Sequence, residues 1–150
     1  MSSVILRPSI VAALVFSISG MMTVGAAAQD APATPPTQEQ ITAGKRVWVD
    51  AACANCHGNN GQGGNSKDFP KGPSMRTSAL DYWTTREIIA CGLPGTLMPA
   101  WAKGAYIDRE CFGGTGEIPE GTRVIGVYDE QQLDDLMAYI NATFRNGEME

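Results

Sequence analysis

The sequence contains no segment that repeats and no long alternation of apolar with polar residues. Alternation with a period of two is the signal of a half-buried strand, and a fixed longer period marks a repeat array. Their absence excludes a repeat architecture and leaves helices as the main regular structure. A chain of 150 residues has about the length of one domain. We therefore expect one small, mostly helical domain.

Basic side chains are also few, because 11 Lys and Arg residues stand against 16 Asp and Glu residues and the formal net charge is −5. Nucleic acids and anionic membranes are bound through basic surfaces, so this balance argues against both as partners. Acidic residues are concentrated in the C-terminal part, where they can steer a basic protein partner. They are Asp108, Glu110, Glu117, Glu120, Asp129, Glu130, Asp134 and Asp135.

Only the N-terminus carries a long apolar run. Ile10 to Val24 is almost purely apolar, Arg7 precedes it, and Ala26-Ala27-Ala28 follows it. This is the pattern of a secretory signal peptide, which predicts a signal over residues 1–28, a mature chain from about Gln29, and export to the periplasm. The run is shorter than the ~20 residues that a membrane span needs. We expect a soluble mature protein with no stable membrane insertion, and an uncleaved N-terminal anchor is the alternative.

Residues 29–37 are rich in Pro, Ala and Thr, a composition typical of a flexible leader. We place the folded domain at residues 38–146. Its first helix begins after Thr37, which forms a capping box with Gln40, and we expect this helix to run into Cys53.

Two more helices are predicted further along the chain. Thr84 and Glu87 form a capping box for the second helix, which Gly92 ends. Asp129 and Gln132 can cap the last helix. The apolar stripe of this last helix consists of Leu133, Leu136, Met137, Tyr139 and Ile140.

Between these helices the chain is crowded with Gly, Asn, Ser and Pro, which predicts loops over residues 58–75, 93–101 and 104–126. Loops of this length are unusual in a small domain unless they wrap something. A small, loop-rich chain also has few elements with which to close a core. We therefore expect a large apolar group to fill the middle of the domain.

Cys53-Ala54-Asn55-Cys56-His57 has the spacing for covalent attachment of a c-type haem. Two residues between the cysteines let both sulfurs reach the two vinyl groups along one edge of the porphyrin. The next residue then directs its imidazole at the iron. We predict one haem c, bound through Cys53 and Cys56 with His57 as an iron ligand, and its burial would supply the missing core.

Other interpretations of the cysteines fit less well. A thioredoxin-type redox pair needs a strand before the motif and a parallel sheet around it, and the sequence predicts neither. A structural zinc site could use all four cysteines, but Cys91 and Cys111 do not form a second close pair. Plain disulfides are the remaining alternative.

The sixth position on the iron needs another residue type, since His57 is the only histidine. Iron ligation by two histidines of this chain is therefore excluded. Met98 is the main candidate, because the turn-forming residues 95–99 can hold its side chain toward the iron. A core methionine is the ordinary alternative. Met75, which follows Gly72-Pro73, is the second candidate, and a less common ligand or an open position also remains.

Cys91 and Cys111 are predicted to form a disulfide, because export places them in an oxidising compartment. The bridge would close a loop that contains Met98 and Trp101. Loop-closure entropy makes such a bridge worth about 3 kcal/mol of stability. A sharper hypothesis is that the bridge also tethers the methionine loop and so keeps the iron six-coordinate.

Taken in chain order, these features resemble the class I c-type cytochromes, and the resemblance covers about residues 37–144. It rests on Cys53 to His57, Gly72-Pro73, Met98-Pro99 and the C-terminal helix. It implies an all-α, cytochrome c-like fold with three or more helices and long loops around a haem. The N- and C-terminal helices would cross beside the haem, and Gly44 would permit their close approach near Tyr139.

The same resemblance implies roles for individual residues. The backbone carbonyl of Pro73 would accept a hydrogen bond from the imidazole of His57, Met98 would be the distal iron ligand, and Trp101 would pack near it. The insertion at residues 103–126 departs from the compact family pattern. It leaves open how exposed the haem edge is and what docks there.

Ligation of the iron by His and Met raises the reduction potential and leaves no place for a substrate. We therefore predict an electron carrier and not an enzyme. It would pass one electron at a time between exported redox proteins, such as a periplasmic dehydrogenase as donor and a terminal oxidase or another cytochrome as acceptor. One alternative is a dedicated electron-accepting subunit of a periplasmic quinoprotein-type dehydrogenase that docks through residues 103–126. Another is a haem enzyme or gas sensor with a displaceable Met98.

Overall fold

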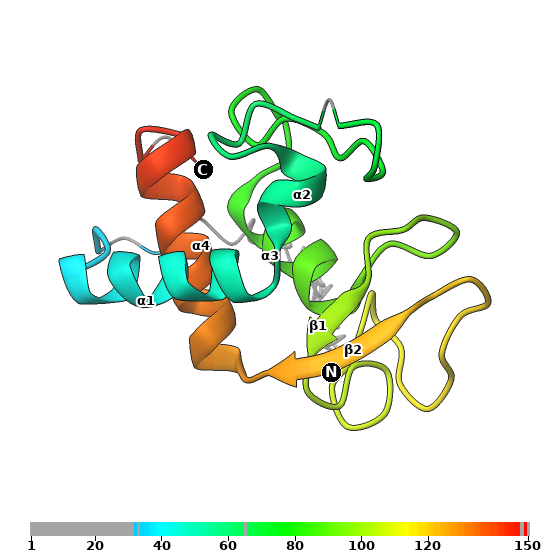
Figure 1. Ribbon diagram of the computed structural model, residues 1–150. Coiled ribbons are helices and arrows are strands. Elements are labelled where there is room, and N and C mark those ends of the chain that lie inside the picture. Colours follow the sequence, from blue (N-terminus) through cyan, green and yellow to red (C-terminus); the bar gives the residue numbers. More distant parts are fainter. Residues whose placement is uncertain (1–31, 33, 65, 148, 150) are drawn as a thin grey trace, which may run out of the picture.

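The computed structural model describes residues 32, 34–64, 66–147 and 149. The predicted signal peptide and the first residues of the predicted leader lie outside this part of the chain. The described residues form four helices and one small sheet, in the order α1 (Gln38–Asp50), α2 (Cys53–His57), α3 (Tyr82–Cys91), β1 (Ala100–Ala102), β2 (Val124–Tyr128) and α4 (Glu130–Phe144) (Figure 1). The predicted helical architecture with long loops is confirmed. Within the described residues, no helix is both long and apolar enough to cross a bilayer.

The two predicted capping boxes at the ends of the domain are both present. Thr37 accepts a hydrogen bond from the Gln40 backbone N–H, and the Gln40 side chain accepts one from the Thr37 N–H. Asp129 and Gln132 make the same reciprocal pair at the start of α4. Each box satisfies two of the N–H groups that a helix N-terminus leaves without partners, which fixes where α1 and α4 begin.

Helix α1 crosses helix α4 (Figure 1), and the contact depends on Gly44. A Cβ atom at this position would collide with the backbone carbonyl of Asp135 and lie 2.8 Å from the Cβ of Tyr139. Trp48 extends the contact, since its ring lies 6.1 Å from the ring of Tyr139 and 5.0 Å from that of Phe144. The close approach that the resemblance implied at Gly44 is therefore present.

The first two helices are not one continuous element, contrary to the prediction that the first helix runs into Cys53. Helix α1 ends at Asp50, and Ala52 adopts a left-handed conformation with a φ of 53° before α2 begins. A left-handed residue reverses the winding of the chain. This break lets α2 leave the axis of α1 and carry the side chains of Cys53, Cys56 and His57 in another direction.

Helix α3 begins three residues earlier than predicted, so the proposed capping box of Thr84 with Glu87 is wrong. Asp81 is the N-cap, and its carboxylate accepts hydrogen bonds from the Thr84 N–H at 2.8 Å and from the Thr84 hydroxyl at 2.7 Å. Gly92 follows the last helical residue, as predicted. Glu87 faces another part of the molecule instead and binds Arg109.

Strands β1 and β2 were not predicted. They pair in parallel, with Ala100 opposite Val124 and Ala102 opposite Tyr128, and the register is irregular between these pairs. One strand has only three residues and the other contains Gly126, so neither shows the alternation that marks a longer strand. The pairing joins the chain just after Met98 to the chain just before α4.

The buried core lies between α1, α3, α4 and β1. Its members include Val47, Trp48, Ile89, Ala90, Ala100, Leu133, Leu136, Met137 and Ile140. Some of these core side chains, among them Trp48, Ile89, Leu136 and Ile140, also line a cavity that the loops between α2 and α3 and between α3 and β1 border.

We expect Gly44→Ala to lower the free energy of unfolding by about 1–3 kcal/mol, because the new methyl group must push α1 away from the α4 backbone. Alanine is the better helix former by about 1 kcal/mol, so a net loss can only come from this contact. Denaturant titration measures the change. Lys45→Ala, at an exposed position of the same helix, is the control and should stay within about 0.5 kcal/mol. Equal stability of Gly44→Ala and the parent would contradict the crossing described here.

Candidate haem-binding site

An apolar cavity of about 460 Å³ opens between α2, α3, α4 and the loops at residues 70–80 and 93–101. This volume lies in the range of roughly 300–1,000 Å³ that is typical of ligand sites. All six residues that the sequence singled out as cofactor-binding line it: Cys53, Cys56, His57, Pro73, Met98 and Trp101. The fold therefore brings together residues that are far apart in the sequence.

Helix α2 supplies the two thiols and the imidazole. Cys53 and Cys56 are three residues apart on a helix, so their side chains lie on the same face. Both are free cysteines. Burial raises the pKa of the Cys53 thiol to about 12, whereas a redox-active cysteine needs a lowered pKa. This environment argues against the thioredoxin-type alternative and suits a thiol that becomes a buried thioether.

The imidazole of His57 is oriented by the backbone of the following loop. Its Nδ1 lies 2.9 Å from the carbonyl oxygen of Pro73. A carbonyl oxygen only accepts hydrogen bonds, so Nδ1 must be the protonated nitrogen of the ring. In the neutral ring the other nitrogen, Nε2, then carries no proton and can bind a metal. The hydrogen bond that the resemblance implied is present, and it selects the tautomer that iron ligation requires.

The loop at residues 58–75 is held against α2 by several backbone hydrogen bonds. The Gly63 N–H donates to the carbonyl of His57 at 2.8 Å, and the Gly72 N–H donates to the carbonyl of Cys56 at 2.8 Å. Gly72 lies so close to the imidazole that a Cβ there would be 2.8 Å from Cε1 and Nδ1 of His57. The long loop thus wraps the histidine, as its length suggested.

Three methionines line the cavity: Met75, Met98 and Met149. Met98 comes from the loop between α3 and β1, where its carbonyl accepts a hydrogen bond from the Leu93 N–H at 3.1 Å. Met75 comes from the loop that holds His57. Met149 is buried, and its N–H donates to the side-chain carbonyl of Asn141 at 3.1 Å. The sequence analysis did not single out Met149, since it stands alone in a polar C-terminal segment.

The remaining lining residues give the cavity its chemistry. Most are apolar, and they include Leu80, Ile88, Ile89, Leu93, Leu97, Leu136 and Ile140. Among the described lining residues, Lys71 and Arg145 are the only charged side chains of the Asp, Glu, Lys or Arg type. Both are basic, which matches the negative propionates of a haem, and the apolar wall matches its ring. Leu136 and Ile140 belong to the predicted apolar stripe of the last helix, but no sequence motif pointed to Lys71 or Arg145, because an isolated basic residue carries no spacing signal.

Trp101 lies on β1, and its ring centroid is 5.7 Å from that of Tyr128 on β2. Cys91 and Cys111, the predicted pair, form a disulfide with their Cα atoms 5.6 Å apart. This bridge removes both sulfurs from any zinc site that would use all four cysteines. Glu87 lies close to the two sulfurs, but the guanidinium of Arg109 contacts Glu87 and Cys91, so this group has no room for a cation.

The donor set and the apolar cavity fit one class of protein, a c-type cytochrome, in which thioether bonds and an imidazole hold the haem. A comparison with known families gives the same answer. The family model described as Cytochrome c matches residues 41–144, and the chain belongs to the cytochrome c family. Membership implies covalently bound haem c, a role in electron transfer, and redox proteins as partners. No curated protein and no solved structure matches the chain.

We expect Gly72→Ala to displace the imidazole of His57 or the loop that binds it, since the added methyl group would overlap the ring. Overpacking of this kind costs about 1–3 kcal/mol of folding free energy. The nuclear magnetic resonance signal of the Nδ1 proton should shift or exchange faster as the hydrogen bond to Pro73 weakens. Gly114→Ala is the control, because its nearest atom lies 3.9 Å away. An unchanged Nδ1 proton signal in Gly72→Ala would count against this account of the site.

Proposed function

We propose that this protein is an exported, soluble electron carrier of the class I type, with a single haem c ligated by His57 and Met98. The observation that supports it most is the shared cavity. Helix α2 and the Met98 loop border the same apolar space. His57, whose Nδ1 is bonded to the Pro73 carbonyl, lines that space too. A haem bound here supplies an iron that takes up and releases one electron at a time.

Side chains of α2 and of the loop after it would hold the haem. Cys53 and Cys56 would become thioethers, which keep the cofactor attached whatever happens at the distal ligand. Pro73 would hold the plane of His57 through the Nδ1 hydrogen bond, and an orienting contact of this kind also raises the basicity of the ligand. Lys71 and Arg145 would pair with the carboxylates of the cofactor.

Two of the cavity methionines differ in their relation to His57, and this favours Met98 as the distal ligand. Met75 lies two residues after Pro73, and its N–H donates to the carbonyl of Gly61 at 2.8 Å within the loop that wraps the histidine. It therefore belongs to the proximal side. Met98 belongs to a separate wall formed by the segment between α3 and β1, from which a sulfur can approach the opposite face.

The apolar lining excludes water from the cofactor, and two protein ligands leave no coordination position for a substrate. These features support a carrier over an enzyme or gas sensor. Three leucines at the cavity, Leu80, Leu93 and Leu97, are exposed, with Leu97 at 73%. They offer an apolar contact to a redox partner. We propose a periplasmic dehydrogenase as donor and a terminal oxidase or another cytochrome as acceptor.

Mass spectrometry of the protein from cells that mature c-type cytochromes tests the attachment. The expected mass is that of the chain from Gln29 plus one haem, less the two hydrogens lost in the disulfide. Cys53→Ala with Cys56→Ala should abolish covalent haem. Cys91→Ala with Cys111→Ala is the matched control and should retain it. A compactly folded, colourless protein with the mass of the bare polypeptide would overturn the proposal.

Met98→Ala should remove the absorption band of the sulfur–iron bond and let the reduced protein bind carbon monoxide. Its reduction potential should fall by on the order of 0.1 V, a fraction of the ~0.8 V range that axial ligands control. Met75→Ala is the control and should keep the band. Ready binding of carbon monoxide by the unmodified protein would favour the haem enzyme or gas sensor. Loss of the band in Met75→Ala alone would make Met75 the ligand.

A further inference from the structure

The 103–126 insertion contacts the Met98 loop, here residues 92–99, at both of its ends and in its middle. Before the loop, Cys91 ends α3 and is bonded to Cys111 of the insertion. After the loop, the Ala100 N–H donates to the carbonyl of Arg123 at 2.8 Å, where β1 begins to pair with β2. The loop is therefore fixed to the insertion at the points where it begins and ends.

The contact in the middle joins two glycines. A Cβ atom on Gly121 would lie 3.2 Å from the backbone nitrogen and 3.3 Å from the Cα of Gly95. The two backbones thus pass so close that a side chain on Gly121 would press against the backbone of Gly95, whereas a Cβ on Gly95 itself would meet nothing within 4 Å. Because Gly95 lies three residues before Met98, this contact limits how far the turn that carries Met98 can move outward.

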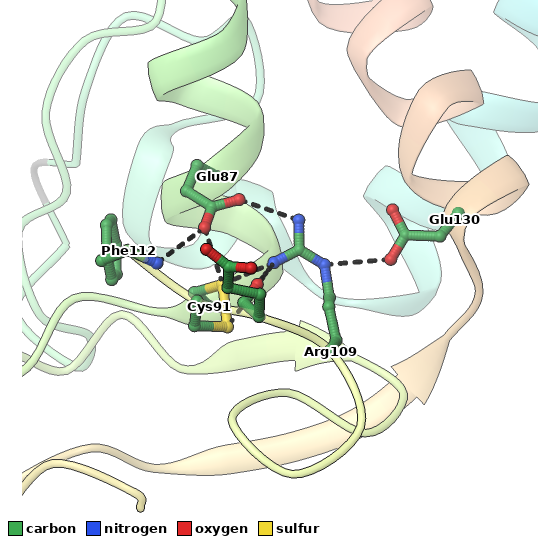
Figure 2. Close-up of a disulfide and its surroundings, with 7 residues drawn as sticks. Glu87, Cys91, Arg109, Phe112 and Glu130 are labelled. Atoms are coloured by element: carbon green, nitrogen blue, oxygen red, sulfur yellow. Dashed lines mark hydrogen bonds and ion pairs between the residues drawn. A yellow bond between two sulfur atoms is a disulfide. The ribbon is translucent and has the colours of Figure 1, made fainter. Parts of the chain in front are cut away.

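Arg109 anchors the insertion to two helices and to the disulfide, as Figure 2 shows. Its guanidinium donates to Glu87 of α3 at 2.8 Å and to Glu130 of α4 at 2.9 Å. It also donates to the Sγ of Cys91 at 2.8 Å and to the carbonyl of Glu110 at 2.7 Å. One side chain of the insertion therefore bonds to α3, to α4 and to the disulfide that precedes the Met98 loop.

Glu87 completes this network from the helix side. One of its carboxylate oxygens accepts from Arg109 and the other accepts from the Phe112 N–H at 2.9 Å (Figure 2). Burial alone would raise the pKa of Glu87, but the bonds from Arg109 and Phe112 outweigh burial and hold that pKa below its ordinary value. Glu87 is thus ionised at neutral pH, and it binds Arg109 and Phe112, which lie on either side of Cys111, to α3.

We propose that the 103–126 insertion is a positioning device that keeps Met98 on the iron, with Arg109 and Gly121 as its positioning residues. This inference rests on the proposed ligation by His57 and Met98. Release of Met98 requires the loop to move outward, and such local opening is governed by the contacts that hold the segment. The insertion thereby acts within the chain and needs no docking partner to explain its length.

The rate at which cyanide binds the oxidised protein measures how often Met98 leaves the iron, because cyanide must take the vacated position. Arg109→Gln should raise this rate by about tenfold or more, since a local opening equilibrium shifts when its closing contacts are lost. Arg86→Gln is the matched control. Arg86 binds Glu130 and Asp134 of α4, and in the described part of the chain it makes no hydrogen bond to the insertion. It should lower global stability with little change in the cyanide rate.

A second pair of variants leaves the charge network intact. Gly121→Ala should speed cyanide binding, because the methyl group pushes the backbone at Gly95 away. Gly116→Ala is the control within the insertion: its φ of 88° is as unfavourable for alanine as the 76° of Gly121, but a Cβ there meets nothing within 4 Å. The backbone strain is therefore shared by the two variants and the contact is not.

Hydrogen exchange gives a readout that does not depend on the iron. The Leu93 amide, which donates to the Met98 carbonyl, should exchange faster in Arg109→Gln and Gly121→Ala than in their controls. Cyanide rates and Leu93 exchange that match the controls would overturn the inference. If Met98→Ala leaves the sulfur–iron band unchanged, the proposed ligation fails, and Leu93 exchange alone still decides whether the insertion restrains the loop.

Discussion

The hydrogen bond between His57 Nδ1 and the Pro73 carbonyl is the interaction on which the rest of the site depends. Without it the imidazole could rotate, or its proton could move from Nδ1 to Nε2. The proposed iron ligation would then lose the lone pair of Nε2. To bring Pro73 beside the ring, the chain between them must fold back on α2, and the bonds of Gly63 and Gly72 to α2 achieve this. The 58–75 loop is long because the chain must turn back along α2 to bring Pro73 beside the imidazole.

The same requirement explains the break between α1 and α2. A continuous helix would keep Cys53 to His57 on the axis of α1, whose inner face is committed to α4 through Gly44 and Trp48. The left-handed residue Ala52 ends the direction of α1 and lets α2 start in a new one. Helix α1 packs against α4 and stabilises the fold, while α2 turns toward the cavity. Helix packing and the proposed cofactor attachment therefore use adjacent segments and do not compete for one helix face.

The sequence was informative where the signal lies within a few residues and only one residue could supply it. The capping boxes at Thr37 and Asp129 are local hydrogen-bond patterns, and they placed two helix starts correctly. The motif from Cys53 to His57 is local as well. The start of α3 was misplaced because Asp81 and Thr84 both carry capping side chains, and only the fold decides between them.

Contacts between distant residues were predicted where the family resemblance or the pairing of cysteines named both partners, and the other distant contacts could not be predicted. Strand β1 is three residues long and exists because the chain near Arg123 returns to it. The side chains of Leu136 and Ile140 were recognised as an apolar stripe, but their place in the cavity wall follows from the crossing with α1. Likewise, nothing near Arg109 in the sequence indicates that its partners stand on α3 and α4.

Contacts between distant residues also change what the acidic residues of the C-terminal part are expected to do. From the sequence alone, their carboxylates suggest a surface that steers a basic partner. In the fold, Asp134 and Glu130 both bind Arg86, and Glu130 also binds Arg109. Asp129 caps α4, and its Oδ2 lies 3.8 Å from the Nζ of Lys103. These carboxylates are engaged within the molecule, so their charge is largely compensated before a partner arrives.

The charges that line the cavity have the opposite sign. Lys71 and Arg145 stand in its wall, and Leu80, Leu93 and Leu97 are exposed beside them. Apolar contact is non-directional and acts only at short range, whereas unpaired surface charge acts over about a Debye length. A partner that docks at the leucines is therefore held by the area of apolar surface that it covers. The approach of a partner from a distance depends instead on the acidic residues that Arg86 and Arg109 do not neutralise. The distribution of these residues on the surface decides how strongly ionic strength affects the rate of association.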